Sequence, residues 1–108
     1  MATFLGEFEQ MVLLAILQMG DQAFGLEVRR EIERSTDRSV SRGAFYTTLD
    51  RLEQKGYVTW DEVPPTGERG GAPLRRFEVT GDGLEVLRAS RRALFNLWRG
   101  LDQIMEDA

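Results

Sequence analysis

Three side chains in one predicted helix could contact nucleic acid: Tyr46, Thr47 and Arg51. They lie in the segment GAFYTTLDRLEQKGYVTW, which runs from Gly43 to Trp60. The hydroxyl groups of Tyr46 and Thr47 can bond to phosphates or to base edges, and the guanidinium of Arg51 can neutralise a phosphate. A helix on an acidic protein usually exposes a mixture of Glu and Lys, so this combination indicates a binding surface.

The helical period divides this segment into two faces. At about 100° per residue, Phe45, Leu49 and Leu52 fall within about 60° of one another, which predicts that they face the core. Gly43 lies on the opposite face and permits a close approach to a nucleic-acid backbone, whereas Asp50 fits poorly beside phosphate. The alternative is a solvated helix face with one half-buried tyrosine. The residues of this opposite face are Gly43, Tyr46, Thr47, Asp50, Arg51 and Gln54.

A second group of basic side chains lies in and beside a glycine-rich loop. Arg69 precedes the Gly70-Gly71 pair, and Arg75 and Arg76 follow it. The loop lacks the lysine and the following helix that a P-loop requires, so flexibility is the commoner meaning of its glycines. Three arginines at this place in an acidic chain favour contacts with a phosphate backbone.

The negative net charge of the chain is not shared by its middle segment. The chain of 108 residues has a net charge of −4, yet residues 25–76 carry nine acids and ten bases. Thirteen of the fourteen basic residues are Arg, the side chain suited to bidentate contacts with phosphate or guanine. A GC-rich genome would explain the number of arginines but not their placement.

The composition argues against an enzyme. The chain has no cysteine and no histidine, which excludes disulfides, thiolate metal sites and the ordinary catalytic triads. Asp61 and Glu62 are adjacent on a predicted strand, so their side chains should point to opposite faces and not form an acid pair. We therefore expect no catalytic residue, no metal and no cofactor. The start of the chain has no basic region typical of a secretory signal, and no apolar run could span a bilayer, which predicts a cytoplasmic protein.

The predicted elements are three helices, two strands and one last helix. The third helix is expected between Ser41, a plausible N-cap, and Gly56, a C-terminal stop. Thr80 should cap the last helix, which is expected to run from about residue 81 to near the end. Mainly α structure with one β-hairpin in this order describes a winged helix–turn–helix, whose third helix docks in the DNA major groove. The other expected ranges are 4–19 and 26–35 for helices and 57–63 and 73–79 for strands.

The last helix carries an apolar stripe that predicts a homodimer. Seven of its residues are spaced 3, 4, 3, 4, 3, 4, which is a heptad seam: Leu84, Leu87, Arg91, Leu94, Trp98, Leu101 and Met105. Phe95 widens the seam, and the first helix, with Phe8 and Val12, is the natural surface to receive it from a second subunit. We call the third helix the reading helix, because it would contact the bases of DNA. Two-fold pairing would place two reading helices about 34–36 Å apart, which matches half-sites one DNA turn apart. Trp98 and Phe95 could also line a pocket for a planar or phenolic effector, with plain interface packing as the alternative.

Four segments of the chain occur in the order and spacing of a known family: LGEFEQMVLLAIL, FGLEVRREIE, SVSRGAFYTTLDRLEQKGYV and GGAPLRRFEVTGDGLEVL. They resemble the PadR family of bacterial transcriptional regulators and cover most of residues 5–87. The Y-x-x-L-x-x-L-x-x-x-G pattern from Tyr46 to Gly56 is fairly specific, and the F-x-V-T-x-x-G pattern from Phe77 to Gly83 supports it.

The resemblance implies a winged-helix DNA-binding protein, usually a repressor, that dimerises through a C-terminal helical region. It implies that Tyr46 contacts DNA, with Arg42 and Thr47 nearby on the reading helix. Only one long helix is predicted after the hairpin, as in short members of the family. The DNA-binding residues expected from the sequence and the resemblance together are Ser41, Arg42, Gly43, Tyr46, Thr47, Arg51, Arg69, Arg75 and Arg76.

We therefore expect a sequence-specific regulator that binds a palindromic operator on double-stranded DNA as a homodimer. Residues 1–80 should form the DNA-binding domain and residues 81–108 the dimerisation helix, within one compact unit. The alternative is a winged-helix module that binds another protein and does not bind DNA. The acidic net charge is compatible with that alternative.

Overall fold

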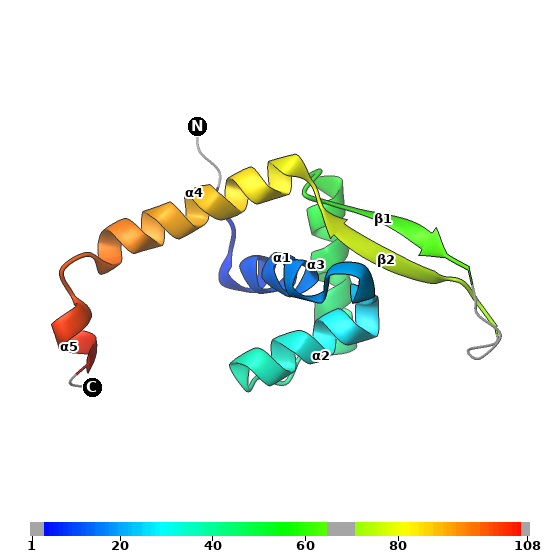
Figure 1. Cartoon of the computed structure of the whole chain (residues 1–108), viewed down its shortest axis with the longest axis horizontal. Coiled ribbons are helices and arrows are strands. Elements are labelled where there is room, and N and C mark those ends of the chain that lie inside the picture. Colours follow the sequence, from blue (N-terminus) through cyan, green and yellow to red (C-terminus); the bar gives the residue numbers. More distant parts are fainter. Residues whose placement is uncertain (1–3, 65–70, 107–108) are drawn as a thin grey trace.

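The computed structural model describes residues 4–64 and 71–106, which form helices around one two-stranded hairpin (Figure 1). The elements are α1 (Glu7–Met19), η1 (Gly20–Gln22), α2 (Gly25–Thr36), α3 (Arg42–Gln54), β1 (Val58–Val63), β2 (Leu74–Val79), α4 (Gly81–Trp98) and α5 (Asp102–Glu106). This order confirms the winged helix–turn–helix fold. None of the helices among the described residues is both long and apolar enough to cross a membrane.

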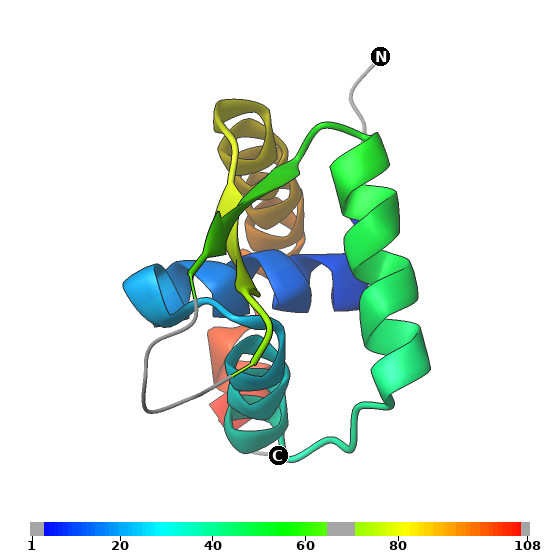
Figure 2. The ribbon, with the colours of Figure 1, turned by 90° about the vertical axis from the view of Figure 1, so that its right-hand side faces the viewer.

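The core lies where α2, α3 and the hairpin meet α1. Val12 and Leu13 of α1, Ile32 of α2, and Phe45 and Leu52 of α3 have almost no exposed surface. In Figure 2, α3 stands upright beside α1, with the hairpin crossing in front of α1. Burial of these side chains on one face of each helix leaves the other face of α3 to solvent.

Both ends of α3 are determined by local chemistry, as the sequence predicts. The Ser41 hydroxyl accepts a hydrogen bond of 3.1 Å from the Ala44 amide, which satisfies one of the free N–H groups of the first turn. Gly56 follows the helix with φ +81°, a conformation that favours glycine, and turns the chain into β1. Phe45, Leu49 and Leu52 are buried, which confirms the inner face.

The hairpin, which we call the wing, is an antiparallel pair in which Val58 pairs with Val79 and Val63 with Leu74. Its base is joined to its neighbours by Thr80. The Thr80 hydroxyl donates to the Gly56 carbonyl at 2.7 Å and accepts from the Gly83 amide at 3.0 Å. One side chain therefore connects the turn after α3 to the first turn of α4.

The expectation of a single last helix is wrong. α4 ends at Trp98, and after Gly100, with φ +81°, the chain forms the short helix α5. Gly100 has the backbone freedom to leave the helix, and its conformation is disfavoured for other residues. The predicted heptad seam is therefore interrupted before Leu101 and Met105. α4 extends away from the helices around α1 and carries α5 at its far end (Figure 1).

Candidate nucleic-acid interface

The outer face of α3 presents the predicted polar side chains together. Arg42, Tyr46, Thr47 and Arg51 are all exposed, and Tyr46 has 37% of its surface accessible. The ring of Tyr46 packs edge-on against buried Phe45, with ring centroids 5.1 Å apart, so its position is supported from below. The guanidinium of Arg42 lies 5.5 Å from the Tyr46 ring centroid, a cation–π distance. The face thus combines hydroxyl donors with cations.

The first turn of α2 lies directly beside Tyr46. A Cβ atom placed on Gly25 would be 2.3 Å from the Tyr46 hydroxyl oxygen, which is less than any real contact of a Cβ atom. Only glycine therefore allows this approach without moving the ring. The first N–H groups of a helix have no partner within it, so this junction presents donors to an anion. The sequence analysis did not identify Gly25 as part of the site, because its closeness to Tyr46 arises only in the folded chain.

The wing places its two adjacent arginines on opposite faces. Arg75 lines a hollow of about 470 Å³ together with Gly25, Arg42 and Tyr46, so it faces the same space as α3. Its guanidinium carbon lies 4.3 Å from the ring centroid of Trp60. Arg75 therefore lies on the side of the wing that faces α3, whereas Arg69 lies outside the described residues.

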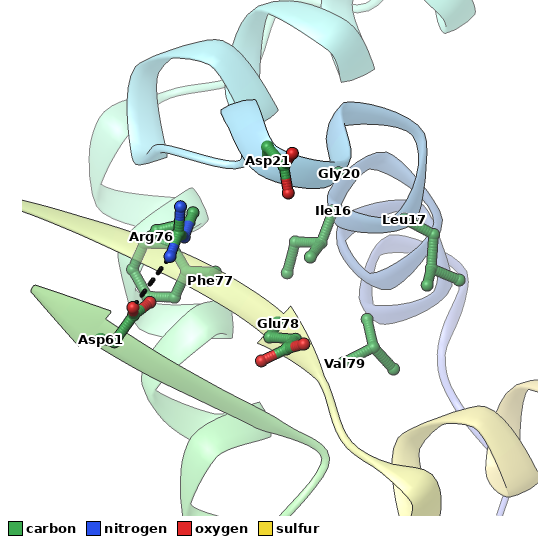
Figure 3. Close-up of a pocket in the computed structure, with 9 residues that line it drawn as sticks. All are labelled: Ile16, Leu17, Gly20, Asp21, Asp61, Arg76, Phe77, Glu78 and Val79. Carbon is green, nitrogen blue, oxygen red and sulfur yellow. Dashed lines mark hydrogen bonds and ion pairs between the residues drawn. The ribbon is translucent and has the colours of Figure 1, made fainter. Parts of the chain in front are cut away.

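The expectation that Arg76 shares this surface needs correction. Its guanidinium forms an ion pair of 3.0 Å with Asp61 on the other face of the wing (Figure 3). That face borders a pocket of about 330 Å³ with Asp21 and Glu78 at its rim and Ile16 among its apolar lining residues. Successive strand residues point to opposite sides, so Arg75 and Arg76 could not both face α3. An acidic pocket does not suit a phosphate.

Ion pairs within the chain engage some cations and leave others available. Lys55 pairs with Glu9 at 2.9 Å, and Arg38 pairs with Glu7 at 2.9 Å. Within residues 4–64 and 71–106, by contrast, Arg42, Arg51 and Arg75 form no ion pair. Among the described residues, other arginines on α2 and α4 also form no ion pair, so the lack of a partner does not by itself single out α3 and the wing. What distinguishes Arg42 and Arg75 is that they line the same hollow beside Tyr46, where an unpaired cation is available to phosphate.

The carboxyl group of Glu9 lies under the C-terminal end of α3. Burial of this group raises its pKa, but hydrogen bonds from Lys55 and from the Gly6 amide, with the positive charges of Lys55 and Arg51, outweigh that effect. The net result is a pKa of Glu9 below its usual 4.5. Glu9 is therefore favoured in its ionised form and holds Lys55 at the end of α3.

Comparison with known proteins agrees with this geometry. No protein with a curated description matches the sequence, but residues 13–89 match the Transcriptional regulator PadR-like family. The chain belongs to this family. It is therefore a PadR-like transcriptional regulator. Proteins of this family regulate transcription by binding DNA and are not enzymes.

Solved structures of transcription regulators share the fold of this PadR-like protein. A PadR-like transcription factor from Bacteroides fragilis is 19% identical, with a TM-score of 0.70 over 90% of this chain and 88% of that one. A PadR family regulator from Clostridium difficile is 19% identical, with a TM-score of 0.64 over 93% and 96%. A PadR family regulator from Eggerthella lenta is 21% identical, with a TM-score of 0.65 over 94% and 88%. The fold of at least 90% of the chain is thus similar to these regulators.

A second surface of the PadR-like regulator is apolar and lies between α1 and α4. Leu14 and Leu17 of α1 and Leu94 and Trp98 of α4 line a groove of about 430 Å³. Leu94 and Trp98 are each 49% exposed, which is unusual for side chains of this size. Phe95, which also lines the groove, is 65% exposed. The residues Leu94, Phe95 and Trp98, which were predicted for a dimer surface, are thus left accessible by the fold.

Other residues predicted for the dimer surface are buried or lie beyond α4. Val12 has 0% of its surface exposed, so it belongs to the core of its own subunit and cannot contact a second one. Leu87 lines the groove but is almost completely buried against that core, and Phe8 is partly buried there. Leu101 and Met105 lie beyond the break at Gly100. The α1 residues that face outward are instead Leu14 and Leu17, which the sequence analysis did not select for this surface.

Proposed function

We propose that the protein is a homodimeric transcriptional repressor that reads a palindromic operator with α3 and contacts the phosphate backbone with the wing. The observation that carries the proposal is the gathering of Arg42, Tyr46 and Arg75 around one hollow. Glu27 also lines this hollow, but neither arginine forms an ion pair among the described residues. The proposed DNA-binding residues are Ser41, Arg42, Gly43, Tyr46, Thr47, Arg51 and Arg75, together with Arg69 outside the described part.

The proposed contacts differ in what they recognise. Tyr46 and Thr47 stand on the outer face of α3, where they would reach base edges or phosphates in the major groove. Arg75 would contact the backbone beside that groove, because the wing lies next to α3 in a winged helix. Gly43 has no neighbouring atom near an added Cβ, so a DNA backbone could approach it closely. Sequence would be read from α3, and position along the duplex would be fixed by the arginines.

The proposed dimer is formed by α4 and α5 and covers the groove between α1 and α4. The groove exposes Leu14, Leu17, Leu94 and Trp98, and an apolar surface of this kind is stabilised when a second copy covers it. In this proposal, residues up to 80 form the DNA-binding domain and residues from 81 onward provide the contact between subunits. Two-fold symmetry would then make the operator palindromic.

We extend the proposal to an effector that would release the operator. A planar or phenolic compound would bind at Trp98 and Phe95, two half-exposed aromatic rings on neighbouring positions of α4. Titration of candidate compounds would be followed by tryptophan fluorescence, with Trp98→Phe as the control, because Trp60 is the other tryptophan in the chain. If no compound changes both fluorescence and operator affinity, the two rings serve interface packing alone.

The decisive experiment is capture of genomic DNA fragments by the purified protein, followed by binding of a recovered duplex at several salt concentrations. The proposal expects one enriched two-fold symmetric motif and an affinity that falls steeply as salt rises, because counterions are released from the phosphates. In a reporter strain, the motif placed at a promoter should lower transcription when the protein is present. If the purified protein captures no DNA but binds another protein, it is instead a protein–protein interaction module.

A further inference from the structure

Arg75 and Trp60 form a contact across the wing that the local sequence does not require. In the antiparallel register, Arg75 is directly opposite Glu62, a residue of opposite charge. The guanidinium nevertheless lies over the Trp60 ring, 4.3 Å from its centroid, and no ion pair among the described residues involves Arg75. Stacking on an aromatic ring supports the plane of a guanidinium and leaves its N–H groups free at the edge.

Trp60 is itself held by the reading helix. Its indole N–H donates a hydrogen bond of 3.1 Å to the carboxylate of Glu53 in α3. The Trp60 ring is partly buried and packs against the hydrophobic core. A continuous series of contacts therefore runs from Glu53 in α3, through Trp60 in β1, to Arg75 in β2.

We infer that Trp60 is a positioning residue for DNA binding: it holds the Arg75 guanidinium at a set place relative to α3. This inference rests on the proposed function, since it concerns how the same surface meets phosphate. A free arginine loses side-chain entropy when it is immobilised on a phosphate, and a pre-positioned arginine loses less. Trp60 thus raises affinity without touching DNA, and Glu53 orients Trp60.

Arg76 provides the matched comparison. It is adjacent to Arg75 in sequence, carries the same charge, and faces the other side of the wing, where Asp61 holds it. If Trp60 acts through Arg75, its removal should matter only while Arg75 is present. Its effect should be independent of Arg76.

The test is a double-mutant cycle on duplex DNA, measured by fluorescence anisotropy with a recovered operator fragment. Trp60→Leu should weaken binding by about three- to tenfold in the otherwise unchanged protein. It should have little further effect in the Arg75→Ala background, and its full effect in the Arg76→Ala background. The salt slope of Trp60→Leu should equal that of the unchanged protein, because the number of phosphate contacts is preserved.

Two further variants separate stacking from folding. Trp60→Phe retains an aromatic platform and should retain most of the affinity. Glu53→Gln retains an acceptor for the indole N–H, whereas Glu53→Ala does not. Both variants lose the negative charge, so a difference between their DNA affinities reports the effect of the hydrogen bond to Trp60 alone. Thermal unfolding is measured for each variant, and Trp60→Met replaces Trp60→Leu in the cycle if the latter is unfolded.

The outcomes distinguish the inference from the proposed function. Equal losses for Trp60→Leu with and without Arg75, in folded protein that binds DNA, overturn the positioning role alone. A loss of affinity for Trp60→Leu that occurs only while Arg75 is present, in protein that still binds DNA in a salt-dependent manner, supports it. A protein that binds no duplex in a salt-dependent manner overturns the proposed function, and with it the inference that depends on it.

Discussion

At the scale of single residues, the position of Tyr46 depends on the absence of a side chain at Gly25. Gly25 has no side chain, and the Tyr46 hydroxyl occupies the space that a Cβ atom would need. The buried ring of Phe45 supports Tyr46 from below, and the Arg42 guanidinium lies near its face. The orientation of one exposed tyrosine is therefore set by three contacts within its own subunit.

Replacement of Gly25 by alanine should weaken DNA binding without unfolding the protein. The added Cβ atom displaces the Tyr46 hydroxyl, which is the far end of a rotatable side chain, so the fold can absorb the change. A displaced contact to DNA should cost on the order of 1–3 kcal/mol of binding free energy. The measurement is operator affinity by anisotropy together with the melting temperature.

Gly81→Ala is the matched control for that experiment. Gly81 begins α4, away from the reading face, and an added Cβ atom there meets no atom within 4 Å. This variant should bind the operator normally. Equal affinities of the Gly25 and Gly81 variants would contradict the role given to Tyr46.

The carboxyl group of Glu9 should link stability to pH. Its pKa in the folded protein is lowered, so its contribution to stability is fully present above the usual 4.5 and is lost as pH falls through the folded pKa. Glu9→Gln should lower the free energy of unfolding at neutral pH by on the order of 1 kcal/mol, because the charge-assisted bonds to Lys55 and Gly6 are weakened.

Denaturant titrations at a series of pH values measure this effect. The difference between the unchanged protein and Glu9→Gln should be constant near neutral pH and should shrink below about pH 4.5. Glu85→Gln, an exposed position on α4, is the control and should change stability little at any pH. A difference that grows in acid would show that Glu9 is not stabilised in its ionised form.

At the scale of elements, the wing has two faces of different electrostatic character. The face toward α3 carries Arg75 on Trp60, and the other face carries Arg76 paired with Asp61 beside an acidic pocket. The base of the wing is joined to the chain before α2 by the hydrogen bond from the Phe77 amide to the Ala23 carbonyl, 2.8 Å long. The orientation of the two faces is thus determined by contacts at the base.

The two wing arginines should therefore behave differently in DNA binding. Arg75→Ala should lower affinity about equally for all DNA sequences and make the log–log salt slope shallower by roughly one unit, because one phosphate contact is lost. Arg76→Ala should change the slope little, since Asp61 already neutralises that side chain. Anisotropy titrations over a range of salt concentrations, on operator and on mixed-sequence DNA, measure both. A larger effect at Arg76 would refute this assignment.

The elements whose signals are local could be predicted from the sequence. The ends of α3 follow from Ser41 and Gly56, and the start of α4 follows from Thr80, because capping depends on a few neighbouring residues. Gly100 was harder to interpret, because an isolated glycine within a helical pattern is often tolerated at a cost of about 1 kcal/mol. The apolar residues on both sides of it continue the period, so the pattern alone does not reveal a break.

The candidate site was only partly predictable, for a different reason. The period of α3 identifies Tyr46, Thr47 and Arg51, because helix geometry relates residues a few positions apart. Strand alternation separates Arg75 from Arg76 but does not say which of them faces α3. That choice, like the closeness of Gly25 to Tyr46 and of Trp60 to Glu53, depends on packing between elements distant in sequence.

At the scale of the whole molecule, the chain is more extended than a single compact domain. Its radius of gyration is 16.0 Å, against about 13 Å for a compact chain of roughly this length. The excess comes from α4 and α5, which extend away from the core around α1 (Figure 1). Their exposed Leu94, Phe95 and Trp98 have few neighbours of their own subunit to cover them.

Charges introduced on this surface should separate the proposed dimer. Leu94→Glu together with Trp98→Glu should give a monomer at micromolar concentration and abolish operator binding, because burying two carboxylates against an apolar groove costs several kcal/mol. Analytical ultracentrifugation measures the oligomeric state. The control is Asn96→Glu, on the opposite side of the same helix and also exposed, which should remain a dimer. An unchanged protein that sediments as a monomer would disprove the dimer.

The bond that Thr80 makes at the root of α4 has a mechanical consequence. α4 has 18 residues and is therefore about 27 Å long, and its start is fixed where the Thr80 hydroxyl meets the Gly56 carbonyl. A difference of about 10° in the direction of such a helix moves its far tip by about 5 Å. In a two-fold dimer built on α4, that difference would alter the distance between the two copies of α3. The contact made by one hydroxyl would then help to determine the length of DNA that separates two half-sites.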